Sequence, residues 1–149
     1  MNKVSMSEIV PLIKEVISGG GKFSFKVTGG SMFPLLIEGR DSVILEKVHT
    51  LKTGDIILYQ RDDENYVLHR IVKIKNGELY LCGDAQFVIE YPIRYNQVIA
   101  VVTSIVRKGE TIKVSDPKYK FYTKVGCHSF KARPYILKAY AKLKKTFKK

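Results

Sequence analysis

The amino-acid sequence predicts a mainly β fold, a coiled antiparallel sheet with one helix before it and one after it. Short apolar stretches alternate with turn residues from position 22 to position 115. Two hairpin-type turn signals, Asp62-Asp63-Glu64-Asn65 and Asn76-Gly77, separate neighbouring stretches. Apolar residues recur at helical spacing near the two ends of the chain, which places the helices there.

The first expected element is an amphipathic helix. Ser5-Met6-Ser7-Glu8 is a capping-box pattern, in which serine and glutamate satisfy each other's backbone amides at the start of a helix. Apolar residues then recur at helical spacing until Gly19-Gly20-Gly21 ends the helix; they are Met6, Ile9, Val10, Ile13, Val16 and Ile17. We expect this face to pack on the domain, the alternative being a membrane anchor.

Strands are expected wherever an apolar or alternating stretch is bounded by turn residues. These stretches are 22–27, 42–46, 55–60, 66–75, 78–82, 98–107 and 111–114. With 149 residues and 45% hydrophobic composition, the chain can bury one substantial core. We therefore expect a single domain over 1–149, with the helix and glycine-rich turn in 1–21, the β core in 22–115 and a basic extension in 116–149.

The C-terminal extension predicts a basic amphipathic helix. Arg133-Pro134 is a helix-start signal. One face then carries apolar residues and another carries lysines; the former are Ile136, Tyr140, Leu143 and Phe147, and the latter Lys138, Lys142, Lys145 and Lys149. Such a helix can lie on an anionic membrane surface. The alternative is a helix packed on the sheet, with its lysines in solvent.

The formal net charge of +12 is confined to the last third of the chain. Residues 1–106 carry 12 Lys/Arg and 12 Asp/Glu, whereas residues 107–149 carry 14 Lys/Arg against Glu110 and Asp116. This distribution suits a membrane surface of negative charge. A nucleic-acid partner is not expected, because no aromatic stacking platform or base-reading motif accompanies the charge.

The sequence contains no apolar run of about eighteen residues and no secretory signal pattern. We therefore expect a cytoplasmic location, with peripheral attachment to the inner membrane face through the basic helix. Cys82 and Cys127 lack metal-ligand spacing and are interpreted as free thiols. His49 and His128 do not complete a zinc site with them, so no metal or other cofactor is expected.

Two segments carry the residues of a hydrolytic site. Ser31 follows Gly29 and Gly30 and precedes Met32-Phe33-Pro34, and His69 closes an apolar stretch further along the chain. A serine hydroxyl becomes a nucleophile only when a neighbouring base accepts its proton, and a neutral imidazole is such a base. Taken separately, a Gly-Gly-Ser segment is more often a turn and a strand histidine more often a structural side chain.

Carboxylates follow the serine and the histidine in chain order. Asp84, preceded by Gly83, comes directly after an expected strand, and Glu90 lies six residues further on. A carboxylate on the far nitrogen of the imidazole fixes its tautomer and stabilises the imidazolium. Serine, histidine and an acid, each at the end of a β stretch, together predict a nucleophilic site.

Five motifs in this order resemble the signal peptidase I superfamily, which includes the LexA-like self-cleaving proteins. Over about residues 27–106 they are Gly30-Ser31-Met32-Phe33-Pro34, Gly39-Arg40-Asp41, Gly54-Asp55-Ile56-Ile57, His69-Arg70-Ile71-Val72 and Gly83-Asp84. Most bacterial members carry a lysine as the base. Members of the endoplasmic-reticulum and archaeal branch carry a histidine there, and this chain resembles that branch. The resemblance implies a mostly β fold and a Ser/His/Asp-type peptidase.

The resemblance implies a role for each matching residue. Ser31 matches the nucleophile, His69 the general base, and Asp84 the aspartate of the Gly-Asp-Asn motif, whose asparagine is replaced by Ala85. The histidine branch commonly has a second aspartate where this chain has Glu90. The acid is therefore either Asp84 or Glu90, or the site is weakened.

The residues around Ser31 are expected to shape the site. Gly29 and Gly30 allow a substrate strand to approach closely, and Pro34 restricts how the chain leaves the nucleophile, with Met32 beside it. The Ser31 amide is the expected oxyanion donor.

Two functions follow from the sequence. The first is a serine endopeptidase that cleaves an extended leader or precursor peptide. The alternative is a catalytically weak peptide-binding or regulatory module of the same fold at the membrane surface. The sequence does not determine the oligomeric state.

Overall fold

The computed structural model describes residues 6–32 and 35–121 of the chain. Within these residues the fold is mainly β, as the sequence predicts, because one antiparallel sheet follows a single α-helix, α1 (Met6–Ser18). The strands are β1 (Phe23–Lys26), β2 (Asp41–Glu46), β3 (Ile56–Gln60), β4 (Tyr66–Lys75), β5 (Glu78–Cys82), β6 (Glu90–Ile93), β7 (Val98–Arg107) and β8 (Glu110–Lys113), with a 3-10 turn, η1 (Tyr95–Gln97), before β7.

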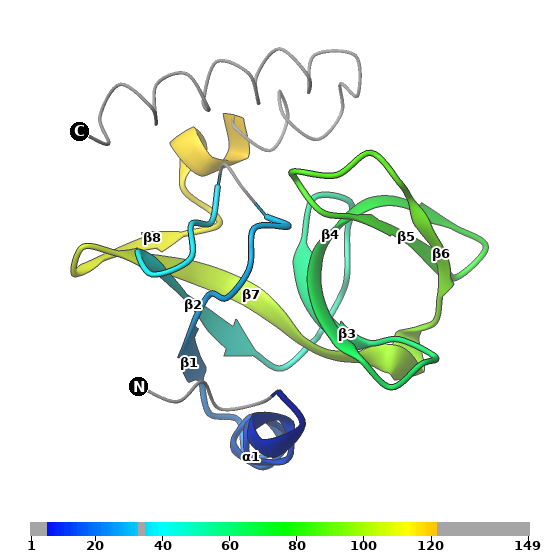
Figure 1. The fold of residues 1–149 in the computed structure, drawn as a ribbon, viewed down its shortest axis with the longest axis horizontal. Coiled ribbons are helices and arrows are strands. Elements are labelled where there is room, and N and C mark those ends of the chain that lie inside the picture. The colour runs from blue at the N-terminus through cyan, green and yellow to red at the C-terminus, as the bar shows by residue number, and fades with distance from the viewer. Residues whose placement is uncertain (1–5, 33–34, 122–149) are drawn as a thin grey trace.

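The sheet has the strand order β1-β2-β7-β3-β4-β5-β6, and β8 also pairs with β7. Strands β3 to β6 curl round in one half of the molecule, and β1, β2 and β8 lie in the other half (Figure 1). The long strand β7 pairs with β2, β3 and β8 and so connects the two halves. Accumulated strand twist gives a sheet of this size its coiled shape.

Strand β3 is buried on both faces, which divides the core into two clusters. Ile56 and Leu58 point into the first cluster, and Ile57 and Tyr59 into the second. The first also contains Ile13, Ile17, Val27, Met32, Leu36, Val43, Leu45, Ala100, Val102, Ile105 and Tyr119, and the second Leu51, Ile71, Leu79, Leu81 and Ile93. The two faces of β3 and β4 therefore have separate environments.

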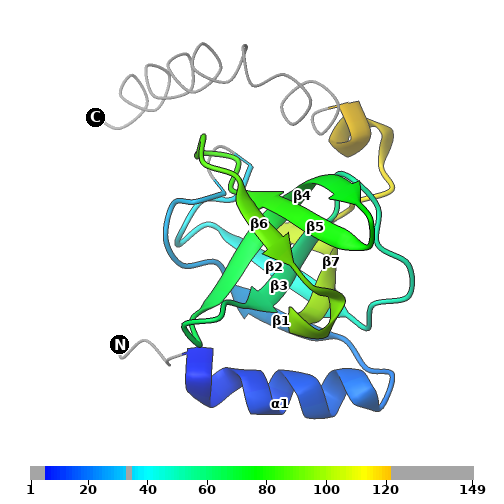
Figure 2. The same cartoon turned by 90° about the vertical axis from the view of Figure 1, so that its right-hand side faces the viewer.

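Helix α1 packs against the sheet. Its buried residues are Val10, Ile13 and Ile17, and the last two belong to the first core cluster. Figure 2 shows the helix lying along the sheet next to β1. This is the packed helix that the periodicity of its apolar residues favours over a membrane anchor.

The predicted strands are confirmed with small shifts at their ends, and β4, β5 and β7 have the predicted bounds. At the Asn76-Gly77 turn both residues have positive φ, 53° and 75°, as a two-residue hairpin of this type requires. Strand β6 was not predicted. Its Pro92 argues against a strand, but β6 lies at the end of the strand order, where an absent backbone N–H does not interrupt a ladder.

Candidate active site

Ser31 lies in the loop between β1 and β2. Gly29 has a φ of 79°, a conformation in which a side chain is strained, so glycine suits this turn. Met32 is only 2% exposed and packs in the first core cluster. Its carbonyl accepts a hydrogen bond from the amide of Leu36 at 2.9 Å. The half-buried Ser31 therefore stands between a glycine turn and a buried side chain that anchors the loop.

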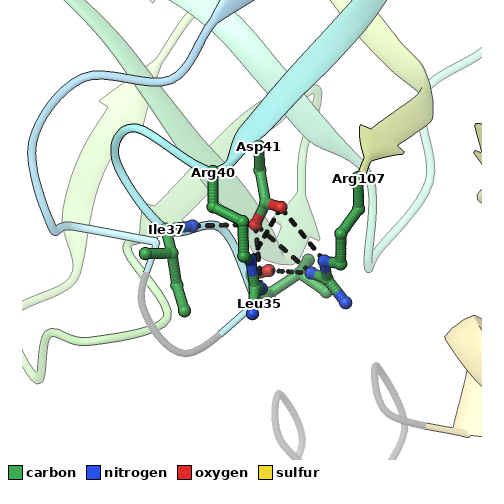
Figure 3. Close-up of polar contacts among 5 residues, drawn as sticks. All are labelled: Leu35, Ile37, Arg40, Asp41 and Arg107. Atoms are coloured by element: carbon green, nitrogen blue, oxygen red, sulfur yellow. Dashed lines mark hydrogen bonds and ion pairs between the residues drawn. The ribbon is translucent and has the colours of Figure 1, made fainter. Parts of the chain in front are cut away.

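A buried carboxylate holds the end of this loop to the sheet (Figure 3). Asp41 accepts hydrogen bonds from the amide of Ile37 at 2.9 Å and from the guanidinium groups of Arg40 and Arg107 at 3.0 Å. Arg107 also donates to the carbonyl of Leu35 at 2.6 Å. Burial alone would raise the pKa of Asp41, but these hydrogen bonds outweigh it and the pKa is lowered. The loop is thereby tied to β2 and β7.

The loop that follows β5 holds Ser31 from the other side. The amide of Ala85 donates a hydrogen bond to the carbonyl oxygen of Ser31 at 3.0 Å. At Gly83 the two segments are so close that a Cβ atom would collide with the same oxygen. Glycine at position 83 is thus required by the approach of the Ser31 loop, a function that the sequence motif alone did not reveal.

His69 lies in β4 opposite Ile57 and is 3% exposed. Its Nδ1 atom is 3.2 Å from the hydroxyl oxygen of Tyr59. Burial lowers the pKa of His69 to about 4, although the nearby Glu90 and Asp84 carboxylates act in the opposite direction. The imidazole is consequently neutral at pH 7, the form that can accept a proton.

Ser31 lies close to β4, the strand that carries His69. Ser31 and the two residues that precede His69, Val67 and Leu68, line the same cavity. Among the hydrogen bonds of the described residues, none joins the Ser31 hydroxyl to His69. Hydrogen bonds between catalytic groups are often long or absent without substrate, so this arrangement is compatible with a nucleophile and base.

Asp84 is bound to Arg70 rather than to His69. Both of its carboxylate oxygens accept hydrogen bonds from the Arg70 guanidinium, each at 2.8 Å, and both side chains are almost wholly buried. Arg70 also donates to the carbonyl of Gly54 at 2.8 Å and to the hydroxyl of Tyr119 at 3.3 Å. The expected Asp84–His69 hydrogen bond is therefore replaced by an ion pair that joins the loop after β5 to β4.

Glu90 reaches His69 through a tyrosine. The hydroxyl of Tyr59 donates a hydrogen bond to Glu90 Oε2 at 2.7 Å, and the same hydroxyl contacts His69. Arg61 donates to Glu90 Oε1 at 2.8 Å, and this hydrogen bond raises the pKa of Arg61. Of the two acids that the sequence leaves open, Glu90 is the one connected to the imidazole.

Sequence reasoning missed three residues of the site: Tyr59, Arg61 and Arg70. Arg70 follows His69 directly in the motif. Because a guanidinium buried in an apolar strand needs a carboxylate partner, the sequence could have predicted an ion pair of Arg70 with an acid. Nothing in the sequence marks Tyr59, because an aromatic residue in a strand is ordinary core. Its role depends on a contact between residues far apart in the chain.

A cavity of about 150 Å³ with a mixed polar and apolar lining lies beside Ser31. It is lined by Met6 from α1, by Phe25, Val27 and Thr28 before the serine, and by Leu58, Tyr66, Val67 and Leu68 from β3 and β4. A cavity of this size can receive one side chain of a peptide. Gly30 borders Ser31, and a Cβ there would meet no atom within 4 Å, so the backbone at this point is open.

Several predicted features lie outside the described residues. They are Pro34, Cys127, the C-terminal helix and its lysines Lys138, Lys142, Lys145 and Lys149. Cys82 is buried, and its Sγ lies within hydrogen-bonding distance of the carbonyl oxygens of Gly83 and Gln86, which share its single hydrogen as acceptors. In the described part of the chain, His, Cys, Asp and Glu form no cluster suited to a metal ion, and no helix is long and apolar enough to cross a membrane.

Comparison with known proteins places this geometry in a family. Residues 2–106 match the family described as Peptidase S24-like. The chain is 24% identical over 102 residues to a LexA repressor of Leifsonia xyli subsp. xyli (strain CTCB07), covering 68% of this chain and 45% of the relative. It is 29% identical over 76 residues to a LexA repressor of Clavibacter sepedonicus, covering 51% of this chain and 33% of the relative.

The chain thus spans less than half the length of these two relatives. The matched region contains the Ser31 loop, β4 with His69, the loop with Asp84 and strand β6 with Glu90. The match covers more than half of the chain and includes every strand from β1 to β6 and most of β7. We conclude that the chain belongs to the Peptidase S24-like family.

Proposed function

We propose that this chain is a serine endopeptidase in which Ser31 is the nucleophile and His69 the general base. The observation that carries the proposal is the placement of Ser31. Its loop is fixed by Asp41 on one side and by Ala85 on the other, next to a small cavity and to the strand that bears His69. Preorganisation of this kind is what nucleophilic catalysis requires.

The proposed reaction follows from the chemistry of these groups. Ser31 Oγ attacks the carbonyl carbon of a peptide bond while His69 accepts the hydroxyl proton. The Ser31 amide donates to the oxyanion of the tetrahedral intermediate. As the C–N bond breaks, the imidazolium returns the proton to the leaving amine. Water then attacks the acyl-enzyme, with His69 again as base, and releases the acid product and free serine.

The proposed substrate is a peptide in extended conformation. The cavity of about 150 Å³ beside Ser31 is small and has a mixed polar and apolar lining, which favours a small or medium side chain near the scissile bond. The histidine at position 69 supports membership of the histidine-base branch within the wider superfamily. A leader or precursor peptide is the substrate class that we favour.

A regulatory module with little activity is the second candidate. It is favoured by the binding of Asp84 to Arg70, which removes that carboxylate from the imidazole, and by relatives that are named repressors. In this case the cavity beside Ser31 would bind a peptide segment without cleaving it.

We further propose that the basic C-terminal segment attaches the protein peripherally to an anionic membrane on the cytoplasmic side. The proposal rests on the charge of the sequence. Residues 107–149 carry 14 Lys/Arg against two acidic residues. Each basic residue near such a surface contributes on the order of 1 kcal/mol.

The peptidase proposal is tested with a diverse peptide library. Purified wild-type protein is incubated with the library, and new termini are identified by mass spectrometry. The same experiment is run with Ser31→Ala and, as a matched control, with Ser24→Ala, which alters an exposed serine on β1. Cleavage by wild type and Ser24→Ala but not by Ser31→Ala supports the proposal. Equal cleavage by all three would refute it, and peptide binding without cleavage would favour the regulatory module.

A further inference from the structure

The hydroxyl of Tyr59 lies between the imidazole of His69 and the carboxylate of Glu90. Its oxygen is 3.2 Å from His69 Nδ1 and 2.7 Å from Glu90 Oε2. Tyr59 is fully buried in the second core cluster, so this phenol cannot turn to solvent. A chain of polar contacts therefore runs from the imidazole through the phenol to the carboxylate.

The single proton of the phenol determines the direction of this chain. A carboxylate accepts hydrogen bonds but cannot donate them, and it is a stronger acceptor than an imidazole nitrogen. The shorter distance to Glu90 agrees with donation of the Tyr59 proton to the carboxylate. The phenol oxygen can then only accept a hydrogen bond from His69. The donor is the hydrogen on Nδ1, the imidazole nitrogen in contact with the phenol.

Arg61 donates a second hydrogen bond to Glu90. The Arg61 Nε atom donates to Glu90 Oε1 at 2.8 Å. The guanidinium carries donors only, so Glu90 is the acceptor in this contact as well as in its contact with Tyr59. The donors and acceptors are therefore consistent along the whole chain of contacts. Glu90 accepts from Arg61 and from Tyr59, and the Tyr59 oxygen accepts from His69.

We propose that Tyr59 is a positioning residue that connects Glu90 to His69 and holds the imidazole in its Nδ1–H tautomer. This inference rests on the proposed peptidase function, because the tautomer leaves the lone pair on Nε2 to take the proton of Ser31. A phenol thereby occupies the position that the carboxylate holds in a Ser-His-Asp triad. Glu90 acts through it without touching the histidine.

The binding of Asp84 to Arg70 makes this connection necessary. Both Asp84 oxygens face the guanidinium of Arg70. A buried neutral imidazole has two tautomers of similar energy unless one nitrogen has a defined partner. Tyr59 supplies that partner in this structure.

The tautomer can be measured directly. Protein labelled with 15N-histidine is examined at pH 7 by NMR correlation of the ring nitrogens with the ring protons, which distinguishes a protonated from an unprotonated Nδ1. The chain has three histidines, and the signals of His69 are identified by their loss in His69→Gln. We expect wild-type His69 to be a neutral Nδ1–H imidazole.

Two variants change the tautomer in different ways. Tyr59→Phe removes the partner of Nδ1, so we expect a mixture of tautomers. Glu90→Ala removes the acceptor of the Tyr59 proton, so the phenol would donate to Nδ1 and the hydrogen of the imidazole would move to Nε2. The Glu90 side chain is 28% exposed whereas Tyr59 is fully buried, so Glu90→Ala is expected to disturb folding less than Tyr59→Phe. Tyr80→Phe is the control, because Tyr80 lies on β5 and stacks on Tyr91.

The second readout is the rate at which a fluorophosphonate probe acylates Ser31. We expect this rate to fall at least about tenfold in Tyr59→Phe and Glu90→Ala and to be unchanged in Tyr80→Phe, because a base in the wrong tautomer cannot accept the serine proton. An Nε2–H imidazole in the wild type, or wild-type tautomer and rate in both Tyr59→Phe and Glu90→Ala, would overturn the inference. The expected tautomers in a wild type that is never acylated would support the Tyr59 connection and contradict the peptidase function, so the two failures are distinguishable.

Discussion

Arg70 and Asp84 form a two-pronged ion pair, with both hydrogen bonds at 2.8 Å and both side chains buried. The pair joins β4, next to His69, to the loop that holds the carbonyl of Ser31. Asp84 therefore acts on the site as a structural link between the two segments that carry the nucleophile and the base.

The first prediction concerns the stability that this pair provides. Asp84→Asn leaves the Arg70 charge buried without its counterion, a change that typically costs about 3–5 kcal/mol. Urea unfolding should show a loss of this size. Glu78→Gln, which alters an exposed carboxylate on β5, should stay within about 0.5 kcal/mol of wild type. Equal stability of the two variants would show that the ion pair does not hold the loop.

The second prediction is a pH dependence caused by His69. Its pKa is about 4 in the folded protein because of burial, against 6.5 for an ordinary histidine. Below pH 6.5 the unfolded chain binds a proton that the folded chain does not, so the free energy of unfolding falls as the pH falls from 6.5 towards 4. The total loss is on the order of 3 kcal/mol, at about 1.36 kcal/mol per pH unit.

Urea unfolding at several pH values between 7 and 4 measures this slope. His69→Gln should lose the contribution of the buried histidine and show a flatter profile than wild type. His49→Gln is the matched control, because His49 is exposed, and it should follow the wild-type profile. If His69→Gln and wild type have the same slope, the imidazole titrates normally and is not buried as described.

The third prediction concerns the contact between the two loops. Gly83→Ala places a methyl group against the carbonyl oxygen of Ser31 and disturbs its hydrogen bond from Ala85. Because a displacement of about 1 Å in an active site can cost about a hundredfold in rate, acylation of Ser31 should fall by at least about tenfold. Gly19→Ala should keep the wild-type rate, since its Cβ would make only an ordinary contact, 3.6 Å from the carbonyl oxygen of Val16. Wild-type acylation of Gly83→Ala would contradict the tight approach of the loops.

The fourth prediction tests peripheral membrane attachment. Co-sedimentation with phosphatidylglycerol vesicles should be appreciable at low salt and should weaken as salt shortens the Debye length from about 10 Å at 0.1 M. Deletion of residues 133–149 removes 7 of the 14 Lys/Arg of the basic segment and should weaken binding further. Vesicles of phosphatidylcholine serve as the uncharged control. If the full-length protein stays in the supernatant with both lipids at low salt, the basic segment is not a membrane anchor.

The sheet could be predicted because local signals agreed with the tertiary structure. Burial alternates along β2 with the two-residue period of a strand, and the Asn76-Gly77 turn fixes the hairpin of β4 and β5. The sequence also placed Ser31 in a glycine-rich loop and His69 in a strand. These features depend on neighbouring residues in the chain, and such signals are visible in a sequence.

The acid of the site could not be chosen from the sequence. The sequence leaves both acids open and favours Asp84, which follows Gly83 in the motif, but the choice depends on which basic side chain each acid meets. Arg70 binds Asp84, and Arg61 and Tyr59 bind Glu90, through contacts between residues 14 to 31 positions apart. Strand β6, which places Glu90, was also hidden by Pro92.

Acylation of Ser31 tests the central claim most directly. Wild-type protein and three variants, Ser31→Ala, His69→Gln and Ser24→Ala, are treated with a fluorophosphonate probe, and the modified residue is identified by peptide mass mapping. We predict modification of Ser31 in wild type and in Ser24→Ala, none in Ser31→Ala, and a rate reduced by about a hundredfold or more in His69→Gln. A wild type that is not modified at Ser31, or that is modified equally fast without His69, would contradict the assignment of Ser31 as nucleophile and His69 as its base.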